Sequence, residues 1–130
     1  MKNVLLPVDI SKAQSWKKSI DTATEIAQRE GATLHVLWVV PEIEWNLNKH
    51  PEDNEPELKK FIAETLPEGI EAKPVIRAGS AHREIRAAAE EVNADLIVLG
   101  SHDPKLTDDL IGSNAAKVAL HSKCSVYVVR

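Results

Sequence analysis

Short apolar runs alternate with segments of helical periodicity along nearly the whole of this chain of 130 residues. The runs predict five buried strands, at residues 3–8, 33–40, 70–77, 94–100 and 125–129. Segments with apolar residues at helical spacing follow the first four strands and predict helices that begin at residues 11, 57, 80 and 113. Strands and helices that alternate in this way form one parallel sheet with helices on both faces.

Two of the runs constrain their own places in the sheet. The run TLHVLWVV at residues 33–40 is apolar almost throughout, which is typical of a strand that helices cover on both faces. The third run contains Pro74, which has no N–H to donate and therefore favours an edge position. We expect a Rossmann-like α/β fold, an open parallel sheet with the strand order 3-2-1-4-5, in one domain that spans residues 1–130.

Local signals mark where several elements begin and end. Ser11 with Gln14 fits a capping box at the start of the first helix, and Gly31 stands where that helix should stop. Ser80 is expected to cap the helix that follows the third strand. Residues 42–56 are polar and rich in proline, so they predict a surface loop.

Composition and charge exclude several classes of protein. The formal net charge is -4 and no basic face is evident, so we expect no nucleic-acid partner. The N-terminal apolar run stops at Pro7 and Asp9, too early for a signal peptide or a membrane helix, so we expect no membrane partner. The single cysteine, Cys124, cannot form an intrachain disulfide, which fits a reducing compartment. We therefore predict a cytoplasmic protein.

A ligand of such a fold binds beyond the carboxyl ends of the strands, where the strand order reverses. In the expected order the reversal falls between the first and fourth strands. Asp9, directly after the first strand, could hydrogen-bond a base or a ribose, although a simple turn cap explains it equally well. Gly100 allows close backbone approach, and the pair Gly112–Ser113 opens the last helix as either an anion site or an ordinary N-cap.

Other chemistry-bearing residues give little sign of a site. None of the five histidines is spaced with another histidine or with Cys124 as metal ligands are, so we expect no metal site. His35 lies within a buried run and is interpreted as a core residue with its hydrogen bonds satisfied, whereas His102 is a candidate functional residue. Neither a G-x-S-x-G nor a P-loop motif occurs, and we predict no catalytic residue.

Three segments resemble the universal stress protein family, and together they extend over nearly the whole chain. They are VLLPVDIS at the N-terminus, VIRAGS at residues 75–80, and the stretch from LIVLGSHD to SVYVVR at residues 96–130. Nucleotide-binding members of the family carry the motif G-x2-G-x9-G-[ST]. Gly100 and Gly112–Ser113 match its two ends, whereas Asp103 stands in place of the middle glycine and the following spacing is one residue shorter.

The resemblance implies a stress-response regulatory protein that binds ATP, or AMP or ADP. Mg²⁺ could bind together with the phosphates. The residues that the resemblance places around the nucleotide are Pro7, Val8, Asp9, Val39, Val40, Gly79, Gly100, His102, Asp103, Gly112, Ser113, Asn114 and Ala115. It also implies that residues 125–130 pair with the same strand of a second subunit, which gives a homodimer or a tetramer.

Two alternative functions remain open at this point. One is an enzyme, at most a weak ATPase, because the phosphate loop offers carboxylates but no dedicated lysine. The other is an interaction protein of the same fold that has lost its nucleotide. Asp103 favours this last reading, since it adds negative charge where phosphates would lie.

Overall fold

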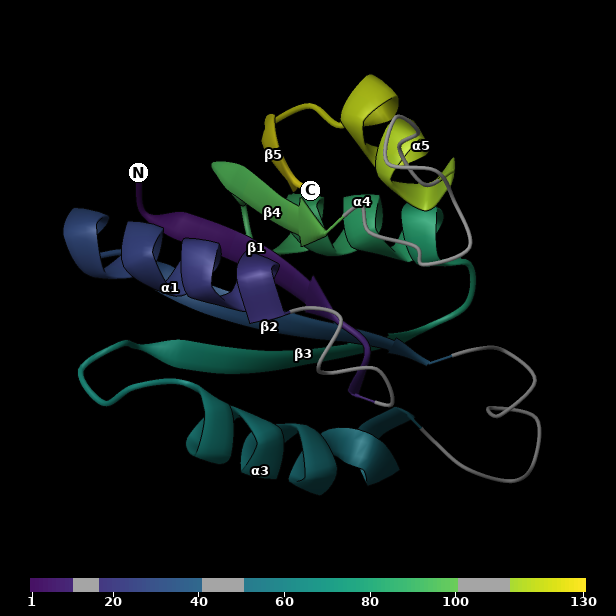
Figure 1. The fold of residues 1–130 in the computed structure, drawn as a ribbon. Helices are drawn as coiled ribbons and strands as arrows, with labels where there is room; N and C mark the ends of the chain where they lie inside the picture. Colours follow the sequence, from purple (N-terminus) through teal and green to yellow (C-terminus); the bar gives the residue numbers. More distant parts are fainter. Residues whose placement is uncertain (11–16, 41–50, 101–112) are drawn as a thin grey trace.

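The computed structural model describes residues 1–10, 17–40, 51–100 and 113–130, and its centre is a five-stranded parallel sheet (Figure 1). The order across the sheet is β3-β2-β1-β4-β5, as predicted. The strands are β1 (Asn3–Val8), β2 (Thr33–Val40), β3 (Ala72–Ala78), β4 (Leu96–Gly100) and β5 (Ser125–Val129). The helices are α1 (Lys17–Glu30), the 3-10 turn η2 (Pro51–Asn54), α3 (Glu55–Thr65), α4 (Ala81–Glu91) and α5 (Ser113–His121).

Helices cover both faces of the sheet, and each face has its own apolar core. Ile20 of α1 and Leu58 of α3 pack with the face that carries Leu6 of β1. Ile85 of α4 and Val118 of α5 pack with the opposite face, which carries Leu5. Neighbouring residues of one strand thus enter different cores, which is why the strands are apolar along their whole length.

The boundaries of three elements differ from those predicted. The third strand occupies Ala72–Ala78 rather than residues 70–77, and the fourth begins at Leu96 rather than residue 94. The expected loop at 42–56 is shortened, because η2 and then α3 begin inside it. Glu55–Thr65 can start as a helix despite its proline, since Pro56 falls in the first turn, where no N–H is needed.

Several local predictions have a clear outcome. Gly31 has a φ of 64° and follows the end of α1, so its role as a helix stop is confirmed. Ser80 occupies the N-cap position of α4, as predicted, although its side chain makes no capping hydrogen bond. His35 is 8% exposed and its Nε2 lies 3.0 Å from Oδ1 of Asn3, which confirms a satisfied core histidine. The proposed capping box lies outside the described residues.

None of the helices in the described parts of the chain is both long enough and apolar enough to cross a membrane.

Candidate functional site

The carboxyl ends of all five strands meet at one edge of the sheet, because every neighbouring pair is parallel. The strand order reverses between β1 and β4. β1 pairs with β2 along its whole length, up to Val8 opposite Trp38. With β4, in contrast, its pairing within the described strands covers only Val4 opposite Leu96 and Leu5 opposite Ile97. The carboxyl halves of these two central strands are therefore not joined, at the place where this type of sheet accepts ligands.

Asp9 and Gly100 flank this unpaired part of the sheet. Asp9 directly follows β1 and is half-buried, and Gly100 is the last residue of β4, paired with Val129 of β5. If the register of β1 and β4 were continued, Val8 would be level with Gly100. A carboxylate and a residue without a side chain therefore end these two neighbouring strands, beyond the point where their pairing stops.

Gly79 adds a third element to this edge. It follows β3 with a φ of 134°, a conformation that L side chains rarely adopt. Its N–H donates a 3.0 Å hydrogen bond to the carbonyl oxygen of Val40, at the end of β2. A Cβ on Gly79 would come within 3.3 Å of Cγ of Glu84. The turn between β3 and α4 therefore needs a glycine both for its backbone angle and for its close packing.

The pair Arg77 and Glu84 supports that turn, and sequence reasoning missed it. Nε of Arg77 on β3 donates a 2.9 Å hydrogen bond to Oε1 of Glu84 in the first turn of α4, and the same guanidinium also binds Glu91. Arg77 and Glu84 are both less than a third exposed, so water screens their attraction only in part. The only sign of this pair in the sequence is that Arg77 and Glu84, which carry opposite charges, lie on either side of Gly79.

Burial limits what the predicted site residues can offer to a ligand. Pro7, Val8, Val40 and Ala115 are buried, and the side chains of Val8 and Ala115 belong to the two apolar cores. Val39 is half-buried and packs toward the core under α4 and α5.

The structure brings seven predicted residues to one edge of the sheet and leaves the phosphate part untested. The seven are Pro7, Val8, Asp9, Val39, Val40, Gly79 and Gly100. Asn114 is exposed in the first turn of α5. His102, Asp103 and Gly112 lie outside the described residues, as does the side chain of Ser113.

Within residues 1–10, 17–40, 51–100 and 113–130, no group of three His, Cys, Asp or Glu side chains is close enough together to hold a metal ion.

Comparisons of this chain with a family model, with curated proteins and with solved structures identify the same family. The model described as "Universal stress protein family" matches residues 1–130. Universal stress protein G of Escherichia coli O157:H7 is 30% identical over 141 aligned residues, with 99% of each chain covered. The solved structure of universal stress protein UspA from Lactobacillus plantarum is 28% identical with a TM-score of 0.74, over 99% of this chain and 97% of that one.

Two further solved structures share the fold and contain nucleotides. One is a universal stress protein in complex with cAMP, 24% identical with a TM-score of 0.67 over 99% of this chain and 97% of the other. The second is the universal stress protein from Archaeoglobus fulgidus in complex with dAMP, 20% identical with a TM-score of 0.72 over 100% and 98%.

Proposed function

This chain belongs to the universal stress protein family, and from that premise we propose that it binds an adenine nucleotide at the carboxyl edge of its sheet. The observation that carries the proposal is the early end of pairing between β1 and β4, with Asp9 and Gly100 on either side. Relatives of the same fold form complexes with cAMP and dAMP, which supports adenine as the base.

Each part of the edge would have a distinct task. The Asp9 carboxylate would accept a hydrogen bond from a ribose hydroxyl or from the base amino group. The turn at Gly79 and the end of β4 at Gly100 would let the ligand approach the backbone closely. The phosphates of ATP, ADP or AMP would lie at the N-terminus of α5, where free N–H groups and the helix dipole favour anions, and Mg²⁺ would accompany them.

The same proposal covers His102, Asp103, Gly112 and Ser113, which would contribute to the phosphate end of the site. Asp103 is the feature that favours a second candidate, an interaction protein of this fold without nucleotide. A weak ATPase activity is compatible with the first candidate, since phosphates and Mg²⁺ would then be held together near water. Replacement of Asp103 by glycine separates these cases, because a large gain in ATP affinity would mean that the natural site is impaired.

We further propose a regulatory role in the cytoplasm, exerted through a homodimer or a tetramer. β5 is an edge strand of the sheet, and one of its side chains, Tyr127, is 48% exposed. An open edge strand with an exposed aromatic residue favours pairing with a second copy of the same strand. A single cysteine without a disulfide partner fits the reducing cytoplasm.

The test is identification and measurement of the bound nucleotide. Mass spectrometry of the purified protein identifies any nucleotide that remains bound, and calorimetry with AMP, ADP and ATP, with and without Mg²⁺, measures affinity. We expect micromolar binding that falls about tenfold in Asp9→Asn, because a hydrogen bond to a charged acceptor is weakened. Asp21→Asn on the exposed surface of α1 is the matched control. Absence of binding by all three nucleotides removes the proposal.

A further inference from the structure

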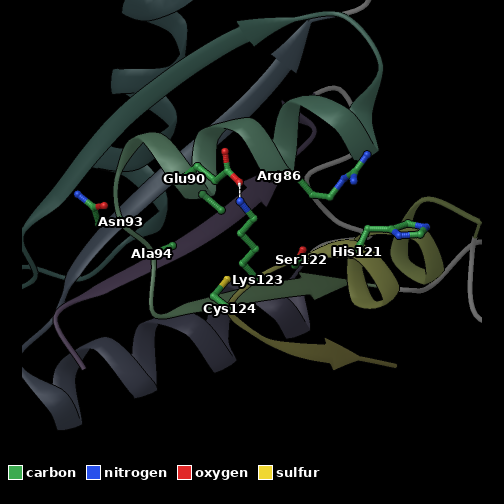
Figure 2. A pocket seen from close by; sticks show the side chains of 9 residues that line it. Arg86, Glu90, Asn93, Ala94, His121, Ser122, Lys123 and Cys124 are labelled. Atoms are coloured by element: carbon green, nitrogen blue, oxygen red, sulfur yellow. Dashed lines mark ion pairs between the residues drawn. The ribbon is translucent and has the colours of Figure 1, made fainter.

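A groove opens between the last turns of α4 and α5, away from the edge where we place the nucleotide (Figure 2). Its volume is about 450 Å³, and its lining includes Arg86, Ala89, His121, Ser122, Lys123 and Cys124. Both helices run from the carboxyl edge of the sheet back toward the amino edge. His121 ends α5 and Ser113 begins it, so the two lie about 12 Å apart along the helix axis.

Basic side chains gather along the seam between these two helices. His82 and Arg86 are one turn apart on α4, and Lys117 and His121 are one turn apart on α5. We call the following five residues the basic cluster: His82, Arg83, Arg86, Lys117 and His121. The members are close enough to influence one another, since partial burial and then the charges of Lys117, Arg86, Arg83 and His121 lower the pKa of His82.

The nearby carboxylates form ion pairs with other residues, including that of Glu90, which lines the groove itself. Glu84 and Glu91 bind Arg77 on β3, and Glu90 forms a 3.1 Å ion pair with Lys123 (Figure 2). No member of the basic cluster makes an ion pair with a carboxylate in the described parts of the chain. A local excess of positive charge on a chain whose net charge is -4 favours an anionic ligand at this place.

Arg86 is arranged to receive such a ligand. Its Nε donates a 3.2 Å hydrogen bond to the backbone oxygen of His82, which orients the guanidinium. Its terminal nitrogens make no hydrogen bond to another described residue, and a planar fork of this kind matches phosphate oxygens. Oγ of Ser122, which lines the groove, and Nδ1 of His82, one turn before Arg86 on α4, are buried without a hydrogen-bond partner among the described residues. An oxygen atom of a ligand in the groove would satisfy the Ser122 hydroxyl.

We propose that the groove between α4 and α5 is a second binding site, which takes a small phosphate-bearing anion and is separate from the nucleotide site. The groove has the volume of a small-molecule site. Two members of the basic cluster, Arg86 and His121, line the groove, and the other three lie on the same two helices, which suits a compact multivalent anion. An extended nucleic acid would meet the negative charge of the rest of the chain. The proposal does not depend on the nucleotide assignment.

Calorimetry with inorganic tripolyphosphate, at low salt and without Mg²⁺, tests this site. The double substitution Arg86→Gln with His121→Gln removes two members of the basic cluster. We expect the affinity to fall at least about tenfold, because charge-assisted hydrogen bonds are lost. The control is Lys18→Gln with Lys60→Gln, two exposed lysines on α1 and α3, which cover the other face of the sheet. The control should stay within about twofold of the native affinity.

The rate of alkylation of Cys124 shows whether the anion binds in the groove, because Cys124 is the only cysteine of the chain and lines the groove. Tripolyphosphate should slow alkylation of Cys124 by iodoacetamide in the native protein and in the lysine control, but not in the Arg86 and His121 variant. The proposal is overturned if tripolyphosphate does not bind at millimolar concentration, or if both double variants lose equal affinity. It is also overturned if ATP displaces tripolyphosphate while Cys124 stays unprotected, or if single-stranded RNA or polyglutamate binds more tightly.

Discussion

The backbone N–H of Gly79 donates a 3.0 Å hydrogen bond to the carbonyl oxygen of Val40. This bond links the turn after β3 to the end of β2, and it fixes one wall of the edge where the nucleotide is proposed to bind. This wall requires a residue without a side chain, because Gly79 has a φ of 134° and Glu84 packs directly against it.

Replacement of Gly79 by alanine should therefore disturb the site. The strained φ and the 3.3 Å approach to Glu84 are expected to destabilise the fold by about 1–3 kcal/mol, measured by urea unfolding. Nucleotide affinity should fall as the turn shifts. Gly69→Ala is the matched control, since Gly69 also has a positive φ, of 92°, but has nothing within 4 Å of the added Cβ. Native affinity in a folded Gly79→Ala protein would contradict this role.

Asp95 joins the starts of two central strands. Its Oδ2 accepts hydrogen bonds from the backbone N–H groups of Lys2, at 2.7 Å, and Asn3, at 2.8 Å. These bonds, that from Asn3 first, hold the pKa of Asp95 below its usual value. The stabilisation is therefore present above the usual pKa of an aspartate and is lost as the pH falls below it. In Asp95→Asn, we expect a lower urea midpoint at neutral pH and a smaller loss on acidification, and equal acid profiles would refute this.

His35 should make stability depend on pH in a different range. Burial, and then the positive charge of Lys73, lower the pKa of His35, while Glu71 acts in the opposite direction. The neutral ring is thus favoured in the folded state, and its stabilisation is lost as the pH falls below about 6.5. His35→Gln removes this titration. Urea midpoints compared at about pH 7 and about pH 5 should differ less in the variant than in the native protein; a larger difference would contradict the assignment.

The sequence predicted the fold far better than it predicted the site. Continuous apolar runs identify strands that are buried on both faces, and Pro74 correctly placed β3 at an edge. Strand ends were less accurate, because hydrogen bonds made by neighbouring chain segments decide them. The N–H of Leu34, for example, bonds to the oxygen of Glu71, just before β3.

The site was only partly predictable for a physical reason. Asp9 and Gly100 could be placed at one edge once the strand order was known. The packing of Glu84 against Gly79 depends instead on the orientation of α4 relative to β3, which no local pattern encodes. The basic cluster was likewise hidden, because His82 and His121 are far apart in the sequence and meet only when α4 packs beside α5.

A charge on β5 should separate the proposed dimer. Tyr127 is half-exposed on the edge strand, so Tyr127→Glu would place like charges near each other in a pair of β5 strands. Light scattering after gel filtration should then give the mass of a monomer. Lys73→Gln on the opposite edge strand, β3, should leave the assembly unchanged. A native protein that is monomeric at high concentration would remove the dimer from the proposal.

The most direct test of the nucleotide site is an NMR titration of the ¹⁵N-labelled protein with AMP. Amide signals of Asp9, Val40, Gly79 and Gly100 should shift together and saturate with one affinity. Signals of Gly31 and Gly69, in the turns at the amino edge of the sheet, should stay in place. Shifts confined to the amino edge or to the groove between α4 and α5, or no shifts at millimolar AMP, would contradict a nucleotide site between β1 and β4.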